Sequence, residues 1–295
     1  MQISELIQSS ATQLAAAQVS FGHGTTNAQD EAAWLVLWCL GIALDTDTTK
    51  LTTELSQEQL KAVSTLVRER IESRKPAAYL TREAWLQGVP FFIDERSIVP
   101  RSFIAELLAE GGFDFWLGES THSVLDLCTG NGSLAVLAAM TYPEVSVVGS
   151  DLSSSALEVA QINVQRHSLQ DRISLIHSDG FKNIAGQFDL ILCNPPYVCA
   201  ASMKELPAEF LAEPALALDG GEDGMDFIRH LLTQAPMHMT EKAVLVLEIG
   251  HEREHFEQAF PALEVVWLET SAGEDQVLLV TRHSLSTVAR SASPI

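Results

Sequence analysis

The sequence predicts an α/β protein built on a doubly wound, seven-stranded sheet, with a small helical domain in front of it. From Ser123 onward, short β-branched runs alternate with helical stretches, which is typical of strands covered by helices on both faces. Before Arg74, apolar residues recur at helical spacing. The length of 295 residues exceeds the ~100–200 residues of one domain, which favours a second, smaller unit.

Residues 1–75 are expected to form the helical domain, which has the size of a substrate-recognition module. Asn27 can cap one of its helices and Ser56 a later one. Its apolar positions at helical spacing include Trp34, Leu35, Leu37, Trp38, Leu60, Val63, Leu66 and Val67. Residues 76–100 are expected to follow as a linking β-hairpin, because aromatic and β-branched residues flank Gly88-Val89-Pro90.

Residues 101–282 are expected to hold the large sheet. Its seven strands are predicted at Ser123–Cys128, Val145–Ser150, Arg172–His177, Phe188–Cys193, Ala243–Glu248, Glu264–Leu268 and Gln276–Thr281. The last two runs follow each other with little helix between them, so we expect the sheet to end in an antiparallel pair. Residues 283–295 are small and polar and are expected to form a mobile tail.

Composition and charge favour a folded protein with a basic partner. Hydrophobic residues make up 46% of the chain and charged residues 19%, which excludes the composition of a disordered chain. Lys and Arg total 18 against 39 for Asp and Glu, so the formal net charge is −21. This charge favours a basic protein partner over direct contact with nucleic acid, because it repels phosphate. A simpler interpretation is that it only keeps the protein in solution.

The sequence carries no signal for export, membrane insertion or a metal. The N-terminus lacks the charged start and compact apolar stretch of a signal peptide. The apolar run at 32–44 is shorter than the ~20 residues that span a bilayer. The cysteines form no CxxC pair and no metal-ligand spacing, so we expect reduced thiols in a cytoplasmic protein at Cys39, Cys128, Cys193 and Cys199.

A glycine-rich turn after the first long strand predicts a ligand site. The strand that contains Asp126 leads into this turn, and a helix begins near Ser133. Gly130 and Gly132 permit positive φ and a close approach of the backbone to a ligand at a helix N-terminus. The turn is neither GxGxxG nor a phosphate-binding loop; it consists of Cys128, Thr129, Gly130, Asn131 and Gly132.

Acidic residues follow the next two strands. Asp151, with Leu152 behind it, lies near the ~20 residues after the glycine turn at which a carboxylate accepts both hydroxyls of a ribose. After the third strand, Asp179-Gly180-Phe181 adds a carboxylate and an aromatic ring where an adenine would lie. Each carboxylate alone can be a surface residue or a helix cap. At successive strand ends they indicate the ligand-binding rim of an open α/β sheet.

The fourth strand ends in Asn194-Pro195-Pro196-Tyr197, which indicates chemistry on a planar nitrogen. The prolines stiffen the turn and leave its carbonyls free. The Asn194 side-chain oxygen and the Pro195 carbonyl can accept the two N–H groups of an NH₂, while Tyr197 packs on its face. No candidate base stands next to the motif, so orientation and charge redistribution must activate the nitrogen. The turn can also be a rigid connection and nothing more.

Together, VLDLCTGNGS, the strand-end Asp151, NPPYV, EPALALDGGEDGMDFIRHLL and LEIGHE resemble the glutamine N5-methyltransferases, over roughly residues 21–280. Members of this family modify the GGQ loop of peptide-release factors or a glutamine of a large-subunit ribosomal protein. The resemblance implies a Rossmann-like fold and the cofactor S-adenosyl-L-methionine. We expect the cofactor to be bound by the glycine turn together with Asp126, Asp151, Leu152, Asp179, Gly180, Phe181 and Asn194. The resemblance also implies that the target glutamine is held by Asn194, Pro195, Pro196 and Tyr197.

The stretches FGHGTTNAQDEA and PAAYLTREAWLQGVPFFIDERSIVPRS resemble the branch that acts on ribosomal protein uL3. Release-factor enzymes usually read PRPETE where this chain has PRSFIAE. Three alternatives stay open: a release-factor methyltransferase, an adenine-N6 nucleic-acid methyltransferase, and a non-catalytic ribosome-assembly factor. Many relatives have Gly at Cys128; because a cysteine prefers ordinary backbone angles, we expect strand-like φ there.

Overall fold

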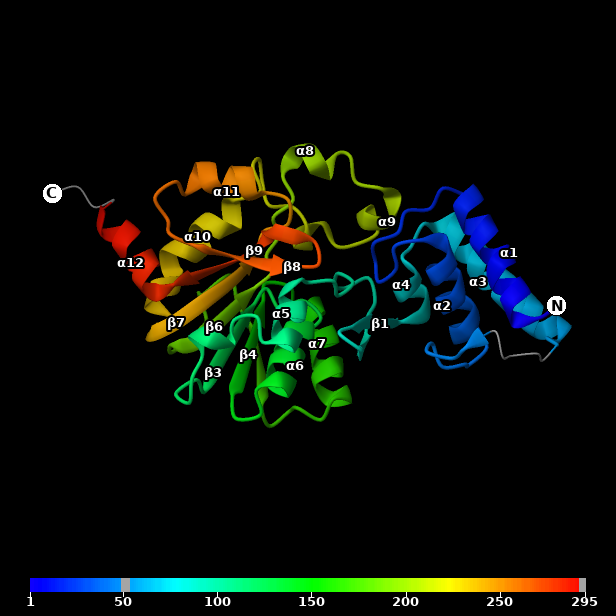
Figure 1. The fold of residues 1–295 in the computed structure, drawn as a ribbon, viewed down its shortest axis with the longest axis horizontal. Coiled ribbons are helices and arrows are strands. Elements are labelled where there is room, and N and C mark those ends of the chain that lie inside the picture. The colour runs from blue at the N-terminus through cyan, green and yellow to red at the C-terminus, as the bar shows by residue number, and fades with distance from the viewer. Residues whose placement is uncertain (49–53, 292–295) are drawn as a thin grey trace.

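The computed structural model of the chain describes residues 1–48 and 54–291. It consists of a helical N-terminal region, a two-stranded hairpin and a seven-stranded sheet with helices on both faces (Figure 1). The predicted doubly wound α/β fold with a helical region in front of it is therefore confirmed. The hairpin lies between these two parts of the molecule, as Figure 1 shows.

The N-terminal region has a small core of its own. Its helices are α1 (Ile3–Ala16), α2 (Ala28–Cys39), α3 (Gln57–Ser73) and the short α4 (Ala77–Thr81). Asn27 accepts a hydrogen bond from the Asp30 N–H and Ser56 accepts one from the Gln59 N–H, so both predicted N-caps are confirmed. Leu14, Leu35 and Val63 are completely buried where α1, α2 and α3 meet.

The hairpin is shorter than the predicted linker. Its strands β1 (Glu83–Leu86) and β2 (Val89–Phe92) pair in antiparallel register. The residues before it form α4 and no strand, because Pro76 starts a run of good helix formers. The side-chain amide of Asn163 connects the hairpin to the large sheet region: it accepts from the Phe92 N–H at 2.7 Å and donates to the Phe92 carbonyl at 3.0 Å.

The large sheet has the strand order β5-β4-β3-β6-β7-β9-β8. Its strands are β3 (Ser123–Leu127), β4 (Ser146–Asp151), β5 (Ile173–His177), β6 (Phe188–Cys193), β7 (Met239–Glu248), β8 (Val266–Thr270) and β9 (Gly273–Thr281). The first five are parallel, and β9 is antiparallel to β7 and β8, so the predicted antiparallel end is confirmed. Because β3 and β6 are neighbours, the glycine turn lies beside the Asn-Pro-Pro-Tyr turn.

Helices cover both faces of this sheet (Figure 1). One face packs against α5 (Ile104–Glu110), α6 (Ser133–Thr141) and α7 (Ser154–Arg166). The other packs against α10 (Asp226–Gln234), α11 (Arg253–Ala259) and α12 (Arg282–Ser291). Between β6 and α10, the chain forms α8 (Ala200–Met203), α9 (Ala208–Leu211) and the 3₁₀ turn η3 (Ala215–Ala217), which lie at the carboxyl ends of the strands. Two further 3₁₀ turns are η2 (Asp114–Trp116) and η4 (Ala235–Met237).

Residues 283–291, where a mobile tail is predicted, are helical. They belong to α12, whose Leu285 is buried against the sheet and whose Arg282 Nε donates to the Pro236 carbonyl. The helix contains few apolar residues, which gives a weak signal in the sequence. Residues 292–295 lie outside the described part of the chain. Among the described helices, none has the length and apolar character needed to cross a membrane. All four cysteines are free.

Candidate active site

The backbone at Cys128 differs from the predicted one. Its φ is 63°, in the left-handed region, so the expectation of strand-like angles was wrong. The chain must turn sharply here, because the next residue, Thr129, donates its N–H to the Ser150 carbonyl at the end of β4 (2.9 Å). The Cys128 thiol is hydrogen-bonded with Cys193 on the neighbouring strand, and this bond, together with burial, raises the pKa of Cys128.

Two buried polar residues, Asp126 and Asn131, hold the glycine turn in place through hydrogen bonds. The Asp126 carboxylate accepts hydrogen bonds from the Thr129 hydroxyl and from the Ala135 N–H (2.9 Å), and burial raises the pKa of Asp126 to about 7. Asn131 donates to the Ile98 carbonyl at 2.9 Å, which ties the turn to the segment after the hairpin. Asp126 does not line a cavity, so it supports the turn from within the fold. Gly130 and Gly132 have φ of 55° and 80°, as predicted.

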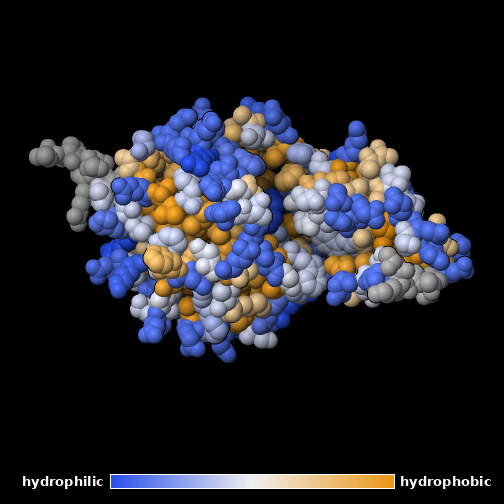
Figure 2. Space-filling model, in the orientation of Figure 1, coloured by the Kyte–Doolittle hydropathy of each residue, from blue (hydrophilic) through white to orange (hydrophobic). Residues whose placement is uncertain are grey.

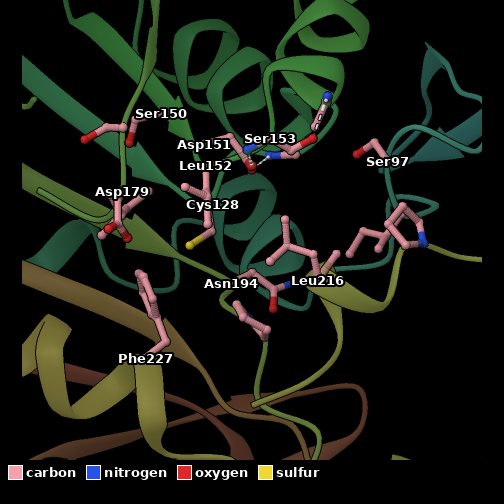
Figure 3. Close-up of a pocket in the computed structure, with 18 of the residues that line it drawn as sticks. Ser97, Cys128, Ser150, Asp151, Leu152, Ser153, Asp179, Asn194, Leu216 and Phe227 are labelled. Atoms are coloured by element: carbon pink, nitrogen blue, oxygen red, sulfur yellow. Dashed lines mark hydrogen bonds between the residues drawn. The ribbon is translucent and has the colours of Figure 1, made fainter. Parts of the chain in front are cut away.

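A cavity opens at the carboxyl ends of β3, β4 and β5, and Asp151 lies in its wall (Figure 3). One carboxylate oxygen of Asp151 accepts the Gly130 N–H at 2.9 Å and the other accepts the Ser153 N–H at 2.8 Å. Each oxygen keeps one lone pair for a ligand. Leu152 and Asp179, with Gly180, also line the cavity, and both side chains are exposed. The structure thus brings together the acidic strand ends that the sequence singled out.

Phe181 does not line this cavity. It is only 4% exposed and stacks on His238, with the ring centroids 4.5 Å apart. The aromatic residue in the wall is Phe227 at the start of α10, which Figure 3 shows next to Asp179. The sequence pattern missed Phe227 because only the packing of α10 on the sheet brings it to the strand ends. The position expected of Phe181 is therefore held by Phe227.

Other wall residues come from segments that gave no signal in the sequence. They belong to the segment after the hairpin and to η3, and they include Arg96, Ser97, Ile98, Pro214, Leu216 and Ala217. The hydroxyls of Ser97 and Ser150 are buried in this wall and find no hydrogen-bond partner in the described part of the chain. Buried polar atoms normally have partners, so these two hydroxyls indicate a polar ligand.

Asn194 lies where the first cavity meets a second one. Its side-chain amide makes no hydrogen bond with the described residues, and no described N–H donates to the Pro195 carbonyl. Both oxygens are therefore free to accept from a ligand, as the sequence predicts. The second cavity is mostly apolar and is lined by Ile98, Arg101, Asn194, Pro195, Tyr197, Val198, Leu206, Phe210, Ala217 and Leu218.

The similarity to known proteins identifies the family of this chain. Residues 114–249 match the model of the methyltransferase small domain. The ribosomal protein uL3 glutamine methyltransferase of Bordetella pertussis is 49% identical over 286 residues, which cover 96% of each chain. That of Burkholderia pseudomallei is 47% identical over 97% of this chain and 96% of the relative, and that of Francisella tularensis is 38% identical over 96% and 91%. The chain belongs to the family of ribosomal protein uL3 glutamine methyltransferases.

The fold is also shared with a more distant methyltransferase structure. The hMettl16 catalytic domain, solved in complex with a 3′UTR hairpin, superposes with a TM-score of 0.51 at 12% sequence identity. The matched region covers 78% of this chain and 83% of that one. At this identity the likeness concerns the fold alone, so the substrate of that domain carries no information about the substrate of this glutamine methyltransferase.

In this glutamine methyltransferase, glycines around Tyr197 explain two of the motifs that the sequence singled out. Gly224 has a φ of 78°, and a Cβ there would lie 2.2 Å from the Tyr197 carbonyl oxygen. Gly250 has a φ of 53°, and a Cβ there would lie 2.5 Å from the Tyr197 ring. Any side chain at either position would displace the tyrosine. The DGGEDG and LEIG motifs thus fix the end of the Asn-Pro-Pro-Tyr turn.

Glu248, at the end of β7, is a buried carboxylate beside the motif that sequence reasoning missed. It accepts hydrogen bonds from the Ser102 hydroxyl at 2.5 Å and from the Phe103 N–H at 2.9 Å, and the Tyr197 hydroxyl lies 3.4 Å from its Oε1. Burial raises the pKa of Glu248 to about 7, and burial also raises the pKa of Tyr197. The carboxylate lies far from Tyr197 in sequence, so only the strand order could have revealed the pair.

Proposed function

We propose that this enzyme transfers a methyl group from S-adenosylmethionine to the side-chain nitrogen of a glutamine in large-subunit ribosomal protein uL3. The observation that carries the proposal is Asn194, whose free amide lies where the cavity at the strand ends meets the second cavity beyond it. Relatives at 38–49% identity over nearly the whole chain are named for this activity, which favours uL3 over a release factor or a nucleic acid.

The first cavity fits the cofactor in its chemistry. The free lone pairs of Asp151 suit the two ribose hydroxyls, and Asp179 suits the amino group of an adenine. Leu152 and Phe227 offer apolar surface for the base, while the Ser97 and Ser150 hydroxyls suit polar atoms of the cofactor. When bound, S-adenosylmethionine supplies an electrophilic methyl group on a sulfonium sulfur.

The second cavity fits the aliphatic part of a glutamine side chain. At its boundary with the first cavity, the Asn194 Oδ1 and the Pro195 carbonyl each accept one N–H of the glutamine amide. This fixes the plane of the amide, and the orientation contributes to catalysis because amide nitrogen is a weak nucleophile. As the N–C bond forms, positive charge develops on the nitrogen, and the two acceptor oxygens stabilise it. The S–C bond breaks with its electron pair left on sulfur, and the methylated amide would become neutral by releasing one N–H proton to water.

Labelling of ribosomal proteins tests this assignment. The enzyme is incubated with methyl-labelled S-adenosylmethionine and the ribosomal proteins of a strain that lacks it, and the labelled residue is identified by mass spectrometry. We expect a single methylated glutamine in uL3. Release factors and deproteinised ribosomal RNA are offered in parallel, and faster labelling of either would reject uL3 as the substrate. No labelling of any of them, with cofactor binding intact, would favour the assembly-factor alternative.

A further inference from the structure

The N-terminal region reaches the second cavity through Phe210 of α9. The ring of Phe210 lies beside the ring of His23, with centroids 4.3 Å apart, and a Cβ on Gly22 would lie 3.2 Å from it. The guanidinium carbon of Arg101 lies 5.4 Å from the centroid of the same ring. Phe210 and Arg101 both line the second cavity, so the FGHGTT stretch contacts the cavity wall from behind.

Glu213, which follows α9 in the chain, contacts both His23 and Arg101. Its two carboxylate oxygens each accept a hydrogen bond from Arg101 at 2.7 Å, and one also accepts the Val99 N–H at 2.9 Å. His23 Nε2 lies 3.3 Å from Glu213 Oε2. Burial opposes ionisation of Glu213, yet Arg101 and His23 hold its pKa down to about 2. Because Glu213 neutralises Arg101, the cavity does not favour an acidic side chain of a substrate.

Glu209, next to Phe210, provides a second attachment to the N-terminal region. It is completely buried, Arg70 of α3 donates to it at 3.3 Å, and Arg74 Nε lies 2.8 Å from its Oε1. The Ser20 N–H also donates to it at 3.0 Å. The position of the Phe210 ring is therefore set by the N-terminal region on both sides, and α9 moves only if these buried ion pairs break.

The surface around Phe210 is apolar and open. Phe210 itself is half-buried, Leu211 is 62% exposed and Leu216 is 56% exposed. Figure 2 shows apolar residues in the hollow between α8 and α9, where the two parts of the molecule meet. Apolar side chains exposed beside a reaction site are typical of a surface that contacts a macromolecular substrate.

We propose that Phe210 is a specificity-determining residue that contacts an apolar side chain of the substrate segment next to the target glutamine. The Gly22-His23 loop holds the ring in place for this contact. The inference rests on the proposed function, since it takes the second cavity as the acceptor side of the site. Under this proposal, the FGHGTT stretch contributes to substrate selection indirectly. It positions the Phe210 ring and does not itself contact the glutamine.

The test measures methyl transfer to intact uL3 by Phe210→Ala, Phe210→Leu and the control Phe115→Ala. Phe115 is 90% exposed and lies outside both cavities. For Phe210→Ala we expect KM to rise about tenfold or more, with an unchanged cofactor Kd, because substrate contact is lost and cofactor contact is not. Phe210→Leu keeps most of the packing on the Gly22-His23 loop, so its KM is expected to lie between those of wild type and Phe210→Ala. Phe115→Ala is expected to behave as wild type.

A double-mutant cycle separates substrate contact from mere packing between the two regions. The apolar residues that flank the labelled glutamine are replaced by Ala in uL3, and the substrate is given to wild type and to Phe210→Leu. Under the proposal, the two changes are less than additive in kcat/KM. Full additivity, or a loss of thermal stability with KM unchanged, would overturn it. If wild type modifies another protein, the same cycle is run on that protein, so failure of the uL3 assignment is seen separately.

Discussion

Asp151 is the residue whose geometry most directly supports cofactor binding. Both of its oxygens accept backbone N–H groups and still offer lone pairs to a ribose. We expect Asp151→Ala to weaken S-adenosylmethionine binding by roughly 1.5–3 kcal/mol, the range for lost hydrogen bonds to a charged group. Calorimetry measures this directly, with Asp171→Ala, an exposed residue outside the cavity, as the control. An unchanged affinity would remove Asp151 from the site.

Asn194 is expected to show the opposite pattern. Its amide makes no hydrogen bond with the described residues and lies at the boundary of the two cavities. In the proposed mechanism it contacts the acceptor amide and not the bulk of the cofactor. Asn194→Ala is therefore predicted to keep near-normal cofactor affinity and to lose turnover by several orders of magnitude. Single-turnover kinetics with saturating cofactor provide the measurement. If the mutant keeps more than about a tenth of the wild-type rate, this contact lowers the activation free energy by less than ~1.4 kcal/mol, which contradicts the mechanism.

Glu248 makes stability depend on pH. Burial raises its pKa from 4.5 to about 7, so the folded protein binds this proton more tightly than the unfolded chain. Its ionisation therefore costs stability as the pH rises from about 4.5 through about 7. Glu248→Gln, which stays neutral, is predicted to gain stability relative to wild type by up to about 3 kcal/mol at pH 8 and by much less at pH 5. Urea unfolding at both values measures the change; an equal difference at both would contradict it.

Site residues that follow strand ends could be predicted, because strands leave a clear sequence pattern and parallel strands end at one edge. This placed Asp151, Asp179 and Asn194 correctly at the cavity. Residues that enter through packing of distant segments could not be found, and Phe227 and Ser97 are of this kind. Phe181 is the opposite case. It lies close to Asp179 in the sequence, but its side chain is buried in the core and does not line the cavity.

At the scale of elements, the glycine turn depends on the left-handed backbone at Cys128. A β-branched residue is strained at this φ by about 1–2 kcal/mol, while glycine adopts it freely. Cys128→Val is therefore predicted to lower the free energy of unfolding by about 2 kcal/mol, and Cys128→Gly to change it by less than about 1 kcal/mol. Denaturant unfolding of both variants tests this. Equal stability of Val and Gly would show that the turn adapts to its side chain.

All seven strands could be predicted, because continuous runs of β-branched residues between turn residues usually form strands. Short helices were harder to predict. Residues 77–81 were assigned to the hairpin and form α4, and residues 283–291 were assigned to a tail and form α12. In both cases the helix is held by a few tertiary contacts, and local sequence pattern does not report such contacts.

At the scale of the whole molecule, the acidic surface and the connection between the two regions bear on substrate choice. The net charge of −21 belongs to a chain in which the buried Glu31, Glu209 and Glu213 are paired with arginines. The remaining acidic residues are mostly on the surface, where they set the field around the protein. A field of this sign attracts a basic protein and repels free nucleic acid, which agrees with a ribosomal protein as the acceptor.

This field makes the reaction rate depend on salt. If a cationic substrate is steered to the enzyme, kcat/KM for uL3 should fall as ionic strength rises, because the Debye length shortens from about 30 Å at 0.01 M to about 8 Å at 0.15 M. Cofactor affinity should change little, since the residues proposed to hold the cofactor line a partly enclosed cavity, where salt screens charges less than at the surface. Initial rates at several salt concentrations, with cofactor saturating, measure the slope. A rate that is independent of salt would mean that the charge keeps the protein in solution and plays no part in substrate choice.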